Sequence, residues 1–179
     1  MGHVIEPATS GRAKCRACGA AIPKGELRFG ERLPNPFADE GEMTLWFHLP
    51  CGAYARPEPF IEALEASAEA VADRPDRIRD ARVSMDHRRL PRLRGAERAP
   101  TGRAKCRHCR KPVAKEAWRL PLVYYEEGRF EPSGFVHVEC SPEYTEADAE
   151  AILDRVRHFS ASLAAEEEAE IRTCLQPED

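Results

Sequence analysis

The sequence has no apolar run long enough to cross a membrane, and its first ten residues, MGHVIEPATS, have no apolar core. A membrane-spanning helix needs about 20 apolar residues, and a secretory signal needs an apolar centre of roughly 7–15 residues. We therefore expect an intracellular protein that does not bind membranes. A phosphate-cradling glycine loop and a convincing nucleophile–base pair are also missing. No catalytic residues are assigned, and an enzyme is not expected.

Cysteine occurs in odd groups, which argues against a disulfide framework. Six of the seven cysteines form two groups of three with closely similar spacing, whereas Cys174 lies beside apolar residues of a predicted helix as a packed thiol. Disulfides join cysteines in pairs and persist in oxidising compartments. In a reducing compartment, the two groups are instead expected to bind metal as thiolates.

The two cysteine groups are copies of one motif. GRAKCR occurs at 11–16 and again at 102–107, an offset of 91 residues, and each copy opens a Cys-x2-Cys pair. A His-x2-Cys pair begins after 29 further residues in the first copy and after 27 in the second. The predicted ligands are Cys15, Cys18, His48 and Cys51, then Cys106, Cys109, His137 and Cys140. We interpret the pattern as an internal duplication.

Three thiolates and one imidazole form a closed tetrahedral set that is typical of structural zinc. A histidine among three cysteines favours zinc over an iron–sulfur cluster. Since all four positions are filled, the ion has no open site at which to activate water. Zinc binding to small peptides contributes roughly 10–16 kcal/mol near neutral pH. We therefore predict two structural Zn²⁺ ions per chain and metal-dependent folding.

Secondary structure is expected to repeat with the ligands. Strand patterns follow each cysteine pair and precede each histidine, at 26–33, 44–47, 116–125 and 134–136. Trp46 and Phe135 in these strands are predicted core residues. Helical apolar stripes follow each copy, and a capping box is predicted at Thr145 and Asp148. The predicted fold is α+β: two small zinc-stabilised modules, each a short antiparallel sheet plus helices.

Module boundaries follow from the repeat and from turn-forming residues. The first module with its helices is expected at 7–90, with Pro75 separating an apolar helix from an arginine-rich one. The second module is expected at 101–179. Between them, LPRLRGAERAP contains two prolines and a glycine, which predicts a linker at 91–100.

The net charge of −4 hides an uneven distribution. Basic residues outnumber acidic ones by six to two over 12–32, by nine to four over 74–98 and by seven to one over 103–119. Cationic stretches beside the metal motifs favour a nucleic-acid partner, although a solvated surface explains 74–98 equally well. From Glu139 onward, twelve acidic residues face three basic ones, which predicts a solvated helix face directed away from phosphates.

The string SGRAKCRACGAAIPKGELRFGE, followed by WFHLPC, resembles the zinc finger of poly(ADP-ribose) polymerases, a type also found at the start of a eukaryotic DNA ligase. GRAKCRHCRKPVAKEAWRL and FVHVEC resemble it more loosely. Fingers of that family bind strand breaks, nicks and exposed DNA ends through structure rather than sequence, often two together. The resemblance implies the same function here, without the family's enzymatic chemistry.

The resemblance also implies two kinds of DNA contact. Arginines that face phosphates in the family match Arg12, Arg28, Arg103 and Arg119, and a guanidinium binds phosphate bidentately. Apolar side chains that stack on exposed base pairs match Phe37, Met43, Leu45, Tyr124, Tyr125 and Phe130. Stacking is worth about 1–3 kcal/mol per base, and it is available only where the duplex is broken. For each apolar residue, covering the small sheet is an equally good explanation.

Two functions remain open from the sequence. One is a DNA-damage sensor or repair accessory, located with DNA in the nucleus or nucleoid, with broken DNA and repair proteins as partners. The alternative is a zinc-scaffolded adaptor between proteins, which the overall negative charge fits better. DNA binding that weakens steeply with salt would favour the first. The oligomeric state is left open.

Overall fold

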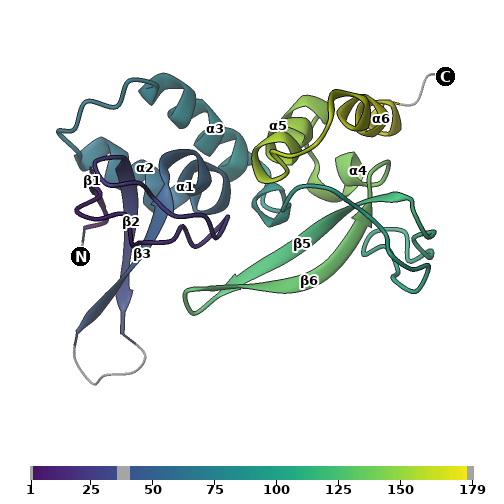
Figure 1. Ribbon diagram of the computed structural model, residues 1–179, viewed down its shortest axis with the longest axis horizontal. Helices are drawn as coiled ribbons and strands as arrows, with labels where there is room; N and C mark the ends of the chain where they lie inside the picture. The colour runs from purple at the N-terminus through teal and green to yellow at the C-terminus, as the bar shows by residue number, and fades with distance from the viewer. Residues whose placement is uncertain (1, 36–40, 177–179) are drawn as a thin grey trace. The chain divides into compact units, whose positions relative to one another are not determined.

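The computed structural model describes residues 2–35 and 41–176, which form two compact units. The first unit is Met1–Asp86 with Tyr125–Phe130, and the second is His87–Tyr124 with Glu131–Asp179. Each contains one three-stranded antiparallel sheet and helices (Figure 1). The predicted α+β fold is confirmed. Within the two described ranges, none of the helices combines the length and apolar character that a membrane crossing requires.

The sheet of the first unit places the second ligand pair at a junction of strand and helix. Its elements are β1 (Val4–Pro7), β2 (Leu27–Pro34), β3 (Glu42–His48), α1 (Leu49–Ala55), α2 (Pro57–Ala66) and α3 (Arg74–Asp86). β2 lies in the centre, antiparallel to β1 and β3. β3 ends at His48 and α1 begins at the next residue, so Cys51 lies in the first turn of that helix.

Side-chain alternation gives the first sheet two different faces. Phe29 pairs with Phe47 across β2 and β3, and both rings are fully buried together with Phe60 of α2. The centroid of the Phe29 ring lies 5.5 Å from that of each of the other two. Arg28 pairs with His48 and therefore faces the opposite side. One face forms the core, and the other carries the ligand histidine.

The second unit has the same strand arrangement, with a shorter first strand and longer second and third strands. Its elements are the 3-10 turn η1 (Leu90–Arg92), β4 (Glu97–Arg98), β5 (Trp118–Glu126), β6 (Arg129–His137), α4 (Ser141–Thr145), α5 (Ala149–Phe159) and α6 (Ala165–Leu175). β5 is the central strand, and β6 ends at the ligand histidine. Leu120, Val136, Ile152 and Ile171 are fully buried. The apolar stripes predicted for α5 and α6 thus contribute to the core.

The segment 91–100, predicted as a linker, is part of the second unit. Glu97 and Arg98 form β4 and pair with Arg119 and Trp118 of β5. β4 corresponds to β1 of the first unit, which was also missed. Strands of two and four residues are too short to show an alternating pattern. Around β4, the two prolines and the glycine of the segment indicated a linker instead.

Two helix starts can be compared with the predictions. Pro75 follows the end of α2 and lies in the first turn of the arginine-rich α3, so the predicted separation of the two helices is confirmed. The missing N–H of a proline has no intrahelical partner to lose in the first turn. The capping box predicted at Thr145 is wrong. The Thr145 hydroxyl donates to the Ser141 carbonyl at 2.7 Å within α4, whereas Asp148 caps α5 by accepting from Ala151 N–H at 2.7 Å.

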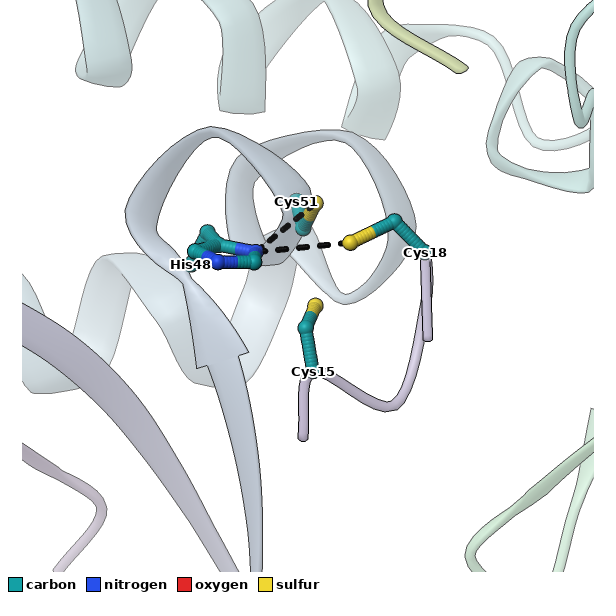
Figure 2. Close-up of side chains that lie close together, drawn as sticks. All are labelled: Cys15, Cys18, His48 and Cys51. Atoms are coloured by element: carbon teal, nitrogen blue, oxygen red, sulfur yellow. Dashed lines mark hydrogen bonds between the residues drawn. The ribbon is translucent and has the colours of Figure 1, made fainter. Parts of the chain in front are cut away.

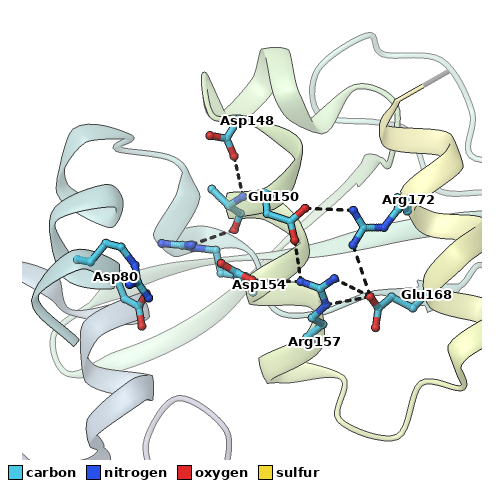
Figure 3. A network of polar contacts seen from close by, with 10 residues as sticks. Asp80, Asp148, Glu150, Asp154, Arg157, Glu168 and Arg172 are labelled. Atoms are coloured by element: carbon cyan, nitrogen blue, oxygen red, sulfur yellow. Dashed lines mark hydrogen bonds and ion pairs between the residues drawn. The ribbon is translucent and has the colours of Figure 1, made fainter. Parts of the chain in front are cut away.

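Carboxylates of α5 and α6, predicted as a solvated face, are paired within the second unit (Figure 3). Arg157 lies 2.9 Å from Glu150 and 2.7 Å from Glu168. Arg172 lies 3.1 Å from Glu150. Hydrogen bonds from the two arginines hold the pKa of Glu150 below its usual value. These pairs join α5 to α6, and they neutralise part of the acidic charge counted from the sequence.

Candidate metal centres

The four predicted ligands of the first unit converge on one point (Figure 2). Their donor atoms, three cysteine sulfurs and Nδ1 of His48, all lie within 4.8 Å of one another. Nδ1 lies 3.4 Å from Cys18 Sγ and 3.9 Å from Cys51 Sγ. Ligands of tetrahedral zinc are about 3.3–3.8 Å apart when the bonds are about 2.0–2.3 Å long. The arrangement therefore fits a single zinc ion.

The second unit repeats this geometry. The sulfurs of Cys106, Cys109 and Cys140 and Nδ1 of His137 lie within 4.8 Å of one another. Nδ1 lies 3.3 Å from Cys109 Sγ and 3.7 Å from Cys140 Sγ. Both ligand sets fit structural zinc, two ions per chain, because each offers four donors of the types that zinc prefers.

Each ligand histidine is oriented by a backbone carbonyl. Nε2 of His48 lies 3.2 Å from the Ala21 oxygen, and Nε2 of His137 lies 3.1 Å from the Pro112 oxygen. Donation from Nε2–H leaves the lone pair of Nδ1 directed at the sulfurs, which is the tautomer a metal ligand needs. Ala21 and Pro112 share the 91-residue offset of the cysteines. The duplication therefore includes the groups that hold the ligands.

The thiols differ in acidity within each set. A hydrogen bond with Cys51 lowers the pKa of Cys15 to about 4, and the same bond together with burial raises the pKa of Cys51 far above its usual value. In the second unit, backbone N–H groups outweigh burial and lower the pKa of Cys106 to about 7. Burial and the charge of Cys106 raise the pKa of Cys140 to about 12. A bound cation would allow all three thiolates of a set to form together.

Arg28, predicted to face phosphate, is buried inside the first unit with only 6% of its surface exposed. Its Nη2 donates to Glu6 Oε1 at 2.7 Å. Its guanidinium lies 3.4 Å from the centroid of the Trp46 ring. Trp46, predicted simply as a core residue, is half-buried and forms a cation–π contact. The guanidinium would have to leave both partners to reach DNA.

Arg119 has the same environment in the second unit. It is 6% exposed, its Nε donates to Glu97 Oε1 at 2.9 Å, and its guanidinium lies 3.5 Å from the Phe135 ring centroid. Neither glutamate partner was predicted, although Glu6 and Glu97 also differ by 91 residues. Extending the repeat upstream of GRAKCR would have found them. Each pairs directly with its arginine in the sheet register.

Arg12 and Arg103, the other two predicted phosphate contacts, are exposed. Both lie in the loop that leads to a Cys-x2-Cys pair. Exposed basic side chains surround them in the sequence: Lys14, Arg16 and Lys24 in the first unit, and Lys105, Arg107, Arg110, Lys111 and Lys115 in the second. Each metal loop is therefore a basic surface, and it contrasts with the buried arginines of the strands.

The predicted stacking residues are placed in different environments. Leu45 is only 2% exposed and belongs to the core of the first unit. Met43 is half-buried, and Tyr124 is 42% exposed. Phe37 lies outside the described residues. Of the four, Met43 and Tyr124 offer accessible apolar surface to a ligand.

Tyr125 and Phe130 belong to the first unit. The Tyr125 hydroxyl donates to Glu31 Oε2 at 3.2 Å, and the ring centroids of Tyr125 and Phe130 are 5.0 Å apart. Phe130 meets the buried Phe47 edge-on at 6.3 Å. Both rings are half-buried and already packed in this structure.

Two Cys3His sites, each formed by a cysteine loop and a strand–helix junction, define a tandem zinc-finger protein. Residues 6–80 match the family described as Poly(ADP-ribose) polymerase and DNA-Ligase Zn-finger region, so this part of the first unit is similar to a PARP-type zinc finger. The matched range begins at Glu6, the partner of Arg28. The relative Poly [ADP-ribose] polymerase of Drosophila melanogaster is 23% identical over 200 aligned residues, which cover 99% of this chain. The chain spans only 20% of that relative's length.

Proposed function

We propose that this protein binds DNA strand breaks, nicks or ends by their structure rather than their sequence, as a damage sensor or repair accessory located with DNA. The observation that carries the proposal is a PARP-type finger over 6–80 whose complete ligand geometry recurs in the second unit. Fingers of this family bind DNA breaks. A duplicated finger offers two such surfaces in one chain.

The exposed arginines of the metal loops are proposed to contact the phosphates. Within the described part of the chain, Arg12 and Arg103 are exposed and have no side-chain hydrogen bond or ion pair that DNA binding would break. Arg28 and Arg119, by contrast, are engaged with glutamate and an aromatic ring. We assign Arg28 and Arg119 a supporting role in holding each sheet. Phosphate contacts position a protein on DNA without reading its bases, which suits recognition of a break.

Break selectivity requires a contact that intact duplex lacks. Met43 and Tyr124 are proposed to stack on the exposed base pair, because they retain accessible apolar surface.

Protein side chains supply all four donors of each zinc set. We therefore propose binding without catalysis, since neither ion would have an open position for water.

The test is competitive fluorescence anisotropy with a nicked or gapped duplex against an intact duplex of equal sequence. We expect tighter binding to the broken duplex and affinity that falls steeply with salt, by counterion release. Arg12→Ala and Arg103→Ala should weaken binding while zinc content stays at two ions per chain. Equal affinity for broken and intact DNA would contradict the proposal, and negligible binding to both would favour the protein-interaction adaptor.

A further inference from the structure

The second unit contains a basic pocket that the zinc sites do not use. Its volume is about 410 Å³, and it is lined by Arg89, Arg92, Arg107, His108, Arg110, Ser133 and Tyr144. Among the side chains that the structure describes, no carboxylate forms an ion pair with any of the four arginines. Glu143 instead pairs with His108, at 2.9 Å between Nε2 and Oε2. Four positive charges therefore meet at one pocket without a matching anion.

Neutral groups hold three of these guanidiniums in place. Arg89 Nη1 donates to the Tyr144 carbonyl at 3.1 Å. Arg92 Nη2 donates to Ser133 Oγ at 3.0 Å, and Arg107 Nε donates to the Ser133 carbonyl at 2.8 Å. Each guanidinium has five N–H donors, so these contacts orient the groups while leaving donors for a ligand.

Gly134 makes room for Arg107. This glycine has a φ of +102°, and a Cβ at its position would lie 2.7 Å from Arg107 Nε. A side chain there would therefore displace the guanidinium that contacts the neighbouring Ser133 carbonyl. Gly134 thus allows the Arg107 side chain to lie close against β6.

Arg110 has a backbone conformation that favours glycine. Its φ is +66°, whereas the equivalent residue of the first unit, 91 positions earlier, is Gly19 with a φ of +75°. Left-handed φ values are unfavourable for residues with a side chain. The second unit therefore tolerates local strain where the first avoids it, and the strained residue lines the pocket.

The first unit does not have the residues for an equivalent pocket. At the same offset, Ala17 occupies the position of His108 and Gly19 that of Arg110. Counted from the last metal ligand of each unit, Ala55 occupies the position of Tyr144. The pocket is therefore a property of the second unit and not a consequence of the shared metal geometry.

We propose that this pocket binds the terminal phosphate monoester of a broken DNA strand. A phosphate monoester carries about −1.5 to −2 charge at neutral pH, more than the single charge of an internal phosphodiester, and guanidinium forks match its oxygens. The phosphate at the end of a DNA strand can enter a concave site, because it is esterified on one side only. An internal phosphate is joined to a sugar on both sides, and both sugars would have to enter with it. The volume lies in the range of ligand sites, which leaves space for the adjoining sugar. This inference rests on the proposed function.

The experiment compares duplexes with a one-nucleotide gap whose ends carry a 5′-phosphate, a 3′-phosphate or hydroxyls alone. Fluorescence anisotropy with the zinc-loaded full chain should show about tenfold tighter binding to one phosphorylated end than to the hydroxyl form, as expected for charge-assisted hydrogen bonds. Arg110→Gly should abolish this ratio without lowering the melting temperature, because glycine suits that backbone. Arg107→Ala should reduce the ratio as well.

Arg16→Ala is the matched control, since Arg16 is the exposed first-unit equivalent of Arg107. It should weaken binding to all three duplexes alike and leave the ratio unchanged. Equal binding of phosphate and hydroxyl ends, or a ratio retained in Arg110→Gly, would overturn the assignment. The assignment would also be overturned if thymidine 5′-monophosphate bound as tightly as the phosphorylated gapped duplex. If gapped DNA still binds more tightly than intact duplex in those cases, the proposed function stands and only the pocket assignment fails.

Discussion

The two units share everything that holds the metal and differ in what surrounds it. Both units have the same ligand geometry and a backbone carbonyl that accepts from the ligand histidine. Both also have a buried arginine between a glutamate and an aromatic ring. The units differ at the residues within and just after the cysteine pair. Ala17 and Gly19 of the first unit are replaced by His108 and Arg110 at the equivalent positions of the second. The duplicated part is the scaffold, and the differences lie where a ligand can reach.

Removing a zinc ligand should have the largest effect of any single substitution. Cys15→Ser should unfold the first unit and Cys106→Ser the second, because structural zinc contributes roughly 10–16 kcal/mol in small peptides. Metal analysis should show one ion per chain in each variant, and amide NMR spectra should show dispersion retained for the other unit. If either variant lost both ions, the two units would depend on each other for folding.

Truncating the buried arginines should show that their role is structural in both units. Arg28→Ala and Arg119→Ala should each destabilise the protein by about 2–3 kcal/mol, below the cost of a fully buried pair because the glutamates are partly exposed. Urea denaturation of the zinc-loaded protein measures this loss. Arg28→Lys, which keeps the charge but not the planar stacking, should lie in between. If these substitutions left stability unchanged and weakened DNA binding, Arg28 and Arg119 would be phosphate contacts and not structural residues.

The two units are packed differently at the residue that follows the last metal ligand, which is Gly52 in the first unit and Ser141 in the second. A Cβ on Gly52 would lie 2.7 Å from Phe29 and 2.9 Å from Phe60, so Gly52→Ala should cost about 1–2 kcal/mol through overpacking. Its equivalent, Ser141, is fully buried and donates to the Val138 carbonyl at 2.6 Å. Ser141→Ala should cost only about 1 kcal/mol, for one lost hydrogen bond. Thermal unfolding of both variants checks the order.

The smallest effect on stability should come from exchanging Gly19 and Arg110, the equivalent residues that both have a left-handed backbone conformation. Arg110→Gly should stabilise the second unit by up to about 1 kcal/mol, because relief of strain is partly offset by the greater freedom of unfolded glycine. Gly19→Arg should destabilise the first unit by about 1 kcal/mol. Differential scanning calorimetry can resolve the opposite signs. A destabilised Arg110→Gly protein would mean that the arginine supports the fold itself.

The sequence was sufficient for the metal sites because ligand spacing and residue type determine them. It was insufficient for Arg28 and Arg119, because whether an arginine faces solvent depends on a partner from another strand. That strand is only two residues long in the second unit. Thr145 was misplaced as a cap for a related reason, since a short helix already used its hydroxyl. Local patterns predicted the ligands, and tertiary contacts decided the roles of the arginines.

The hairpin between the ligand pairs has a consequence for the order of folding. In each unit, two strands lie between the Cys-x2-Cys and His-x2-Cys pairs, across 29 or 27 residues. Closing such a loop carries an entropic cost that depends only weakly on its length, so this cost is nearly the same in both units. The cysteine pair can hold zinc early, and strand pairing then delivers the histidine and the last cysteine together. Pairing of the hairpin strands therefore also brings the last two zinc ligands to the first two.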